Sequence, residues 1–235
     1  MKTAIMQPYI FPYIGYYQLI DAVDQFIIFD DVNFIKRGWI NRNNILLNKN
    51  KHLFSIPLSK PSQNKLICDT KLNFPEKERK AFLRTVSDAY KKAPHFADVY
   101  PILEEIIYYK DEDLTSYLHN SLLKTCQYIG VKVNMQISSK IDYNRSLDAE
   151  GKIIDICKNM KTSTYINLPG GRDLYNKDNF IKNNIELEYI NSLFDEIKYK
   201  QYSNEFIDNL SCIDFMMFND KDNLSNLIKK YNLTD

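Results

Sequence analysis

Short apolar runs alternate with segments of helical periodicity along much of the chain. Residues 2–7 form an apolar run that Pro8 bounds, which predicts a buried strand, and residues 14–23 then place apolar side chains near helical spacing. A second apolar run, rich in β-branched and aromatic residues, covers residues 25–29. Strand, loop, helix and strand in this order predict a parallel βαβ unit.

The next part of the chain predicts a hairpin and then three helices. Two strand-like runs surround residues 48–51, and helical spacing recurs three times between residues 74 and 130, where Gly130 is expected to end the last helix. We expect a β-hairpin insertion over residues 32–60 and a helical insertion or subdomain over residues 74–130. Both are expected to belong to a single α/β domain of residues 1–235.

The alternating rhythm returns after residue 130. A strand is predicted over residues 131–137 from the apolar residues Val131, Val133, Met135 and Ile137. Further elements are expected in the order helix 148–160, strand 164–167, helix 173–182, strand 185–190 and C-terminal helices. The chain is therefore predicted to be an α/β protein, with a mostly parallel twisted sheet and flanking helices.

Composition and charge narrow the functional classes. The chain is 44% hydrophobic and 26% charged, and 31 basic against 30 acidic residues leave a net charge of +1. This balance argues against DNA as a partner, and no apolar run is long enough for a membrane span. The start of the chain lacks an export-signal pattern, and its four cysteines are widely spaced. We therefore expect a cytoplasmic protein without a metal site.

Candidate binding residues follow the predicted strands, because ligands of open parallel sheets bind outside the carboxyl ends of the strands. Four such segments are rich in hydrogen-bonding side chains or glycine. The candidate substrate-binding residues in them are Gln7, Tyr9, Tyr13, Gly15, Tyr16, Lys36, Arg37, Trp39, Asn41, Arg42, Asn43, Ser138, Ser139, Gly170, Gly171 and Arg172.

Each segment has a binding and a structural interpretation. Trp39 is the only tryptophan and lies among arginines and asparagines, a combination that holds sugars and phosphates. Gly170 and Gly171 precede Arg172, which would offer an anion backbone donors and a cation. The tyrosines of the first segment equally suit a stiff loop that caps the core, and the serine pair equally suits a simple turn.

Asp30 and Asp31, at the end of the second predicted strand, are the best-placed candidates for a catalytic base. The three histidines, His52, His95 and His119, are scattered and are expected to be structural or exposed. The chain contains no Ser-His-Asp order, HExxH, Walker A or GxGxxG motif. These absences argue against hydrolase, zincin, P-loop and ordinary dinucleotide-binding classes.

Several blocks of the sequence carry a family signature. They are MQPYIFPYIGYYQLIDAVDQFIIFDDVNFIKRGWINRN at 6–43, ISS at 137–139, LPGGRDLY at 168–175, KYKQY at 198–202 and FIDNLSCIDFMMFN at 206–219. In this order they resemble the WbqC-like protein family. The resemblance implies a bacterial cytoplasmic protein of O-antigen, capsule or related surface-polysaccharide biosynthesis, and a glycine transferase that acts on an amino sugar. It brings no established set of catalytic residues.

A second resemblance concerns the loop between the first strand and the first helix. Residues 13–16, Tyr-Ile-Gly-Tyr, lie where nucleotidylyltransferases have a His-x-Gly-His loop, and ISSK at 137–140 is similar to their second phosphate-binding signature. The resemblance implies a nucleotide-binding, nucleotidylyltransferase-like sheet and an enzyme that adenylates an acid. Tyrosine supplies no cation at neutral pH, so adenylation is a weaker hypothesis than acyl transfer.

The leading hypothesis is a transferase that forms an amide on a nucleotide-linked amino sugar. Asp30 or Asp31 would serve as the base, while Lys36, Arg37 and Arg42 would hold the diphosphate. The alternatives are a non-catalytic module that binds a sugar nucleotide or a pathway partner, and an adenylating enzyme. The cofactor stays open between ATP with magnesium and an acyl or aminoacyl donor. Aminoacyl-tRNA as that donor and a homo-oligomer also stay open.

Overall fold

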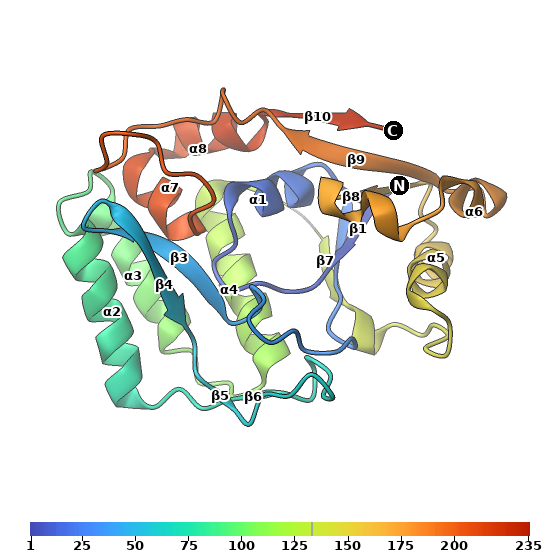
Figure 1. Ribbon diagram of the computed structural model, residues 1–235, viewed down its shortest axis with the longest axis horizontal. Helices are drawn as coiled ribbons and strands as arrows, with labels where there is room; N and C mark the ends of the chain where they lie inside the picture. The colour runs from blue at the N-terminus through green and yellow to red at the C-terminus, as the bar shows by residue number, and fades with distance from the viewer. Residues whose placement is uncertain (133) are drawn as a thin grey trace.

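The computed structural model describes residues 1–132 and 134–235, and its main sheet has six strands (Figure 1). The strands are β1 (Lys2–Met6), β2 (Gln25–Ile28), β7 (Asn134–Ile137), β8 (Thr164–Asn167), β9 (Glu186–Ser192) and β10 (Tyr231–Thr234). The order across the sheet is β10-β9-β8-β1-β2-β7. Five strands are parallel and β10 pairs antiparallel with β9. The predicted α/β class is confirmed.

The order of the parallel strands defines where a ligand is expected. From β1 the chain builds outward through β2 and β7, and it then returns to the other side of β1 with β8 and β9. The direction of winding therefore reverses between β1 and β8. Open α/β sheets bind ligands outside the carboxyl ends of the strands at such a switch point.

The predicted βαβ unit is present. Helix α1 (Ile14–Asp21) connects β1 to β2, and Met6 pairs with Ile28, which in turn pairs with Ile137 of β7. The carboxyl ends of these three strands therefore meet at one edge of the sheet. All four residues of β2 are buried, as are the four of β8, and neither sequence alternates between apolar and polar residues, as expected for strands that are covered on both faces.

The predicted hairpin and helices also form. Strands β3 (Arg42–Leu47) and β4 (Asn50–Ser55) pair antiparallel around Asn48 and Lys49, whose φ angles of 50° and 64° suit a tight hairpin turn. Two short strands, β5 (Leu58–Ser59) and β6 (Lys71–Leu72), form a second ladder. Three helices follow: α2 (Glu76–Tyr90), α3 (Phe96–Ile107) and α4 (Leu114–Ile129). Gly130, at φ 90°, ends α4 as expected.

One hydrophobic cluster joins these helices to the sheet and the hairpin. It includes Phe26 of β2, Phe54 of β4, Leu83 of α2, Leu103 of α3 and Leu118 of α4. Helices α2 and α3 lie at the opposite end of the molecule from α5 (Ala149–Asn159) and α6 (Lys177–Lys182) (Figure 1). The division of the chain into a domain with two insertions stays a prediction.

The second half of the chain differs from the prediction in the start of one helix and in one added strand. The helix expected from residue 173 begins at Lys177 in α6, because residues 169–174 form a 3₁₀ helix and the side chain of Asn176 caps α6. The C-terminal region contains α7 (Cys212–Phe218) and α8 (Lys221–Ile228), as expected, and also the unpredicted strand β10. Val133, included in the predicted strand 131–137, lies outside the described residues. Among the described helices, none has the length and apolar character to cross a bilayer.

Candidate functional site

A pocket of about 450 Å³ opens where the loop between β1 and α1 meets the β3–β4 hairpin. Eight residues line it: Tyr9, Pro12, Tyr13, Trp39, Asn43, Asn44, Lys51 and Asn209. The β1–α1 loop leaves the carboxyl end of β1, one of the two strands at the switch point. The structure therefore brings together Tyr9 and Tyr13 of the first candidate segment with Trp39 and Asn43 of the second.

Gly15 and Tyr16 support the tyrosine wall of this pocket from behind. A Cβ atom on Gly15 would lie 2.5 Å from Cε2 of Tyr13, so only glycine lets that ring lie against the start of α1. Tyr16 is fully buried; its hydroxyl donates to the carbonyl of Gln7 at 2.8 Å, and its ring centroid is 5.4 Å from that of Tyr9. Tyr16 was predicted to bind substrate, but its side chain is fully buried and does not line the pocket.

Both pocket tyrosines are neutral hydrogen-bond donors at physiological pH. Burial raises the pKa of Tyr9, and burial together with the neighbouring Tyr9 raises the pKa of Tyr13 to about 12. Each hydroxyl therefore keeps its proton. Two phenol donors beside an indole ring suit the hydroxyl groups and the apolar face of a sugar, or a nucleotide base.

The side-chain amides of Asn41 and Asn43 form hydrogen bonds that stabilise the fold. The side-chain amide of Asn43 donates to the carbonyls of Ile10 at 3.3 Å and Phe11 at 2.8 Å, which ties the hairpin to the β1–α1 loop. That of Asn41 donates to the carbonyl of Ile56 at 2.9 Å. Neither amide group is free to rotate toward a ligand without breaking these bonds. Their predicted contact with substrate therefore has less support than that of the aromatic residues.

Arg42 braces the turn that carries Trp39. Its Nε donates to the carbonyl of Gly38 at 2.9 Å, a terminal nitrogen donates to the carbonyl of Arg37, and the guanidinium lies 5.6 Å from the Trp39 ring centre. Trp39 keeps 44% of its surface exposed. Lys36 and Arg37 are exposed in the same turn and do not line the pocket. These three cations therefore stay predicted, not observed, phosphate ligands.

A second cluster forms where β2 and β7 end side by side. The hydroxyl of Ser138 lies between the carboxylates of Asp30 and Asp31, 3.0 Å from Oδ1 of Asp30 and in contact with Oδ1 of Asp31. Ser139 donates to Asp30 twice, from its backbone N–H at 2.9 Å and from its hydroxyl at 2.8 Å. Asp30 is 1% exposed and Asp31 8%. The third and second candidate segments thus meet, as the parallel strands require.

Arg145 and Tyr143 complete this cluster. Oδ2 of Asp31 accepts from the Tyr143 hydroxyl at 2.7 Å and from Nε of Arg145 at 2.9 Å, and the guanidinium lies 4.5 Å from the Tyr143 ring centre. A terminal nitrogen of Arg145 also donates to the carbonyls of Ser138, Ser139 and Ile141. The contact with Asp31 raises the pKa of Tyr143, after the larger effect of burial. Arg145 thereby closes the 138–145 loop over the buried carboxylates.

Comparison with known proteins identifies the family. The sequence profile of the WbqC-like protein family matches residues 7–226. The chain belongs to the WbqC-like family. An uncharacterised protein of Mycobacterium tuberculosis, Rv1507c, is 28% identical over 203 residues, which cover 86% of this chain and 85% of that protein. No solved structure matches the chain. The residues of the pocket and of the Asp30–Asp31 cluster all lie within the part that the WbqC-like profile matches.

The fourth candidate segment of this WbqC-like chain does not join the pocket. A Cβ on Gly171 would lie 2.3 Å from Nδ2 of Asn167, whereas nothing lies within 4 Å of one on Gly170. The Arg172 guanidinium donates to Thr234 Oγ at 2.6 Å and stacks over Tyr189 at 4.5 Å. Arg172 therefore holds the C-terminal strand, and its predicted role toward an anion has no geometric support.

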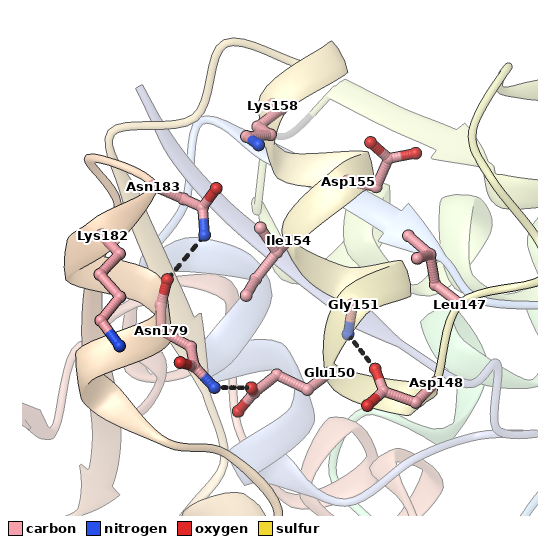
Figure 2. Close-up of a pocket in the computed structure, with 10 residues that line it drawn as sticks. All are labelled: Leu147, Asp148, Glu150, Gly151, Ile154, Asp155, Lys158, Asn179, Lys182 and Asn183. Carbon is pink, nitrogen blue, oxygen red and sulfur yellow. Dashed lines mark hydrogen bonds between the residues drawn. The ribbon is translucent and has the colours of Figure 1, made fainter.

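A smaller, open pocket of about 260 Å³ lies between α5 and α6 (Figure 2). Two of its acidic side chains accept hydrogen bonds from the helices. Oδ1 of Asp148 accepts from the N–H of Gly151 at 2.7 Å, and Oε1 of Glu150 accepts from the amide of Asn179 at 2.5 Å. None of the candidate residues lines it. Within residues 1–132 and 134–235, no group of three or more His, Cys, Asp or Glu side chains is placed to hold a metal ion.

Several residues of the candidate site were not predicted from the sequence. Asn44, Lys51 and Asn209 line the pocket, and Tyr143 and Arg145 belong to the Asp30–Asp31 cluster. In the described part of the chain, the side-chain amides of Asn44 and Asn209 make no hydrogen bond. Tyr143 and Arg145 follow the serine pair closely, which was a usable signal. Asn209 lies in a late family block, but the pattern alone does not bring it to the hairpin.

Proposed function

We propose that this protein is a transferase of surface-polysaccharide biosynthesis that joins an acyl or aminoacyl group to the amine of a nucleotide-linked amino sugar. The observation that carries the proposal is the 450 Å³ pocket between the β1–α1 loop and the β3–β4 hairpin, with its Tyr9, Tyr13 and Trp39 walls. This volume is in the range of small-molecule sites. The family resemblance supports the polysaccharide pathway and the transfer of glycine.

The pocket supplies the interactions that a sugar needs. Aromatic faces contact the apolar C–H face of a pyranose or stack on a base, and neutral phenols donate to hydroxyl or phosphate oxygens. The amides of Asn44 and Asn209 add donors and acceptors at the pocket wall. The combination favours a ligand with one apolar ring face and many hydroxyl groups over a purely apolar or a purely ionic one.

Amide formation also requires a base. The sugar amine attacks the acyl carbonyl as the neutral amine, the bond to the leaving group breaks, and the nitrogen loses a proton. Asp30 and Asp31 stay the predicted proton acceptors, with Ser138 and Arg145 holding their carboxylates in place. Asp30→Asn is expected to abolish turnover and to leave ligand binding unchanged. Retained turnover would remove Asp30 from the mechanism.

The experiment that tests the proposal has two stages. A thermal-shift screen of the protein against nucleoside-diphosphate amino sugars, ATP with magnesium, and acyl thioesters identifies what stabilises the fold, because a ligand of the native state raises the midpoint. Mass spectrometry of the bound amino sugar after incubation with activated glycine then detects an added acyl group. A shift and a mass gain support the proposal, whereas absence of binding to every nucleotide sugar refutes it.

A non-catalytic sugar-nucleotide-binding module is the second candidate. It is favoured by the burial of Asp30 and Asp31 and by the number of hydrogen bonds that protein groups already donate to their carboxylates. This candidate predicts saturable binding with no change in sugar mass under any donor. No comparable observation favours adenylation, because Tyr16 of the His-x-Gly-His-like loop is buried away from the pocket.

A further inference from the structure

An ion pair joins two segments at the edge of the aromatic pocket. Nζ of Lys51, on β4, lies 3.0 Å from Oδ1 of Asp208, in the segment between β9 and α7. Lys51 lines the pocket, as does Asn209, the residue after Asp208. Asp208 itself lines an adjoining hollow together with Tyr13 and Asn209. Both charges therefore border the space beside the tyrosine wall.

This pair is positioned to exchange partners. Its side chains are 43% and 62% exposed, and ion pairs with that much access to water contribute little to stability. Of the eight residues that line the pocket, Lys51 alone carries a charge. An anionic group that enters the pocket therefore meets the Lys51 amine first. A phosphate competes well with one exposed carboxylate, because it offers more negative charge and more acceptor oxygens.

If Lys51 turns to the phosphate of a ligand, Asp208 is left beside the pocket with a negative charge and without its partner. The same ligand satisfies that charge if it carries a cation a short distance from its phosphate. An amino sugar linked to phosphate has both groups, an ammonium on the ring and phosphate oxygens at the linkage. A sugar nucleotide whose sugar is uncharged has only the phosphate, and a free amino sugar has only the ammonium.

We infer that Lys51 and Asp208 exchange their mutual ion pair for the phosphate and the ammonium of one ligand, which makes the pocket selective for sugars that carry both charges. This inference rests on the proposed function and names the substrate class of its site. It assigns the phosphate contact to Lys51, in the pocket, and not to the neighbouring turn of Lys36, Arg37 and Arg42.

The test measures dissociation constants by isothermal titration calorimetry for three probes: UDP-glucosamine, UDP-N-acetylglucosamine and glucosamine. Lys51→Met is expected to weaken both UDP sugars about tenfold, because one charge-assisted contact is lost, and to leave glucosamine unchanged or tighter, because Asp208 no longer pairs with Lys51. Asp208→Asn is expected to weaken UDP-glucosamine about tenfold, and to leave UDP-N-acetylglucosamine unchanged or tighter.

A matched pair controls for surface charge. Lys124 and Glu105 form an ion pair of 2.7 Å with exposures of 40% and 60%, and neither residue lines the pocket. Lys124→Met and Glu105→Gln are expected to change none of the three constants. Equal effects of Lys51→Met and Asp208→Asn on all three probes, or no effect of either, would overturn the inference and leave the proposed function standing. No binding of any probe by the wild type refutes both.

Discussion

Replacing Arg145 by Met is expected to destabilise the fold because it removes the cation beside a buried carboxylate. The side chain of Asp31 is 4% exposed and that of Arg145 is 45% exposed. Breaking a fully buried pair costs about 3–5 kcal/mol, and exposed pairs contribute about 1 kcal/mol or less. Water can reach the half-exposed guanidinium site, so we expect a loss of about 2 kcal/mol.

The matched control for this prediction is Lys124→Met. Lys124 is exposed to a similar extent, 40%, but its partner Glu105 is 60% exposed. Its loss is therefore expected to cost less than about 1 kcal/mol. Urea unfolding followed by far-ultraviolet circular dichroism gives both values from the transition midpoints at unchanged slope. If Arg145→Met and Lys124→Met shift the midpoint equally, the burial of Asp31 does not decide the cost.

Two further predictions concern the pocket wall and a buried acid. Gly15→Ala is expected to move the Tyr13 ring by about 1 Å, so calorimetry should show UDP-glucosamine binding about tenfold more weakly than to the wild type. Gly170 has open space around it, so Gly170→Ala should bind UDP-glucosamine with the wild-type constant. Equal constants for the two variants would contradict this prediction. Burial raises the pKa of Asp214, whose oxygens accept from Tyr90 and Tyr199. At pH values between the usual carboxyl pKa and the raised one, Asp214 keeps its proton in the folded chain and releases it in the unfolded chain. The contribution of Asp214 to stability therefore falls as the pH rises through this range. The difference in unfolding free energy between wild type and Asp214→Asn should shrink over that pH range in urea titrations, and a growing difference would refute the assignment.

Local patterns predicted most of the elements. The apolar runs of β1 and β2 and the spacing of α1 follow from neighbours in sequence, and so do the hairpin and helices α2 to α4. Strand β10 was not predicted, because its four residues are only partly buried and its pairing with β9 depends on a partner about 40 residues earlier. Thr234, for example, pairs with Tyr189. A short edge strand leaves little local signal.

In the candidate site too, residues that follow strand ends could be predicted from the sequence, whereas contacts between distant segments could not. The rule that ligands bind at the carboxyl ends of strands led to Tyr9, Tyr13 and Trp39, and the structure places all three around one pocket. The burial of Tyr16 could not be predicted from the spacing, because α1 is buried on nearly every side and spacing does not distinguish pocket from core. Lys51 contacts a residue 157 positions away, a tertiary pairing that no local pattern encodes.

The claim that the pocket binds a sugar nucleotide is tested most directly by calorimetry of UDP-glucosamine with the wild type, Trp39→Ala and Tyr109→Ala. Trp39 lines the pocket, whereas Tyr109, 36% exposed after α3, does not. We predict saturable binding to the wild type and to Tyr109→Ala with the same constant, and binding at least about tenfold weaker to Trp39→Ala. Equal affinity of all three proteins, or no binding by the wild type, would contradict the account.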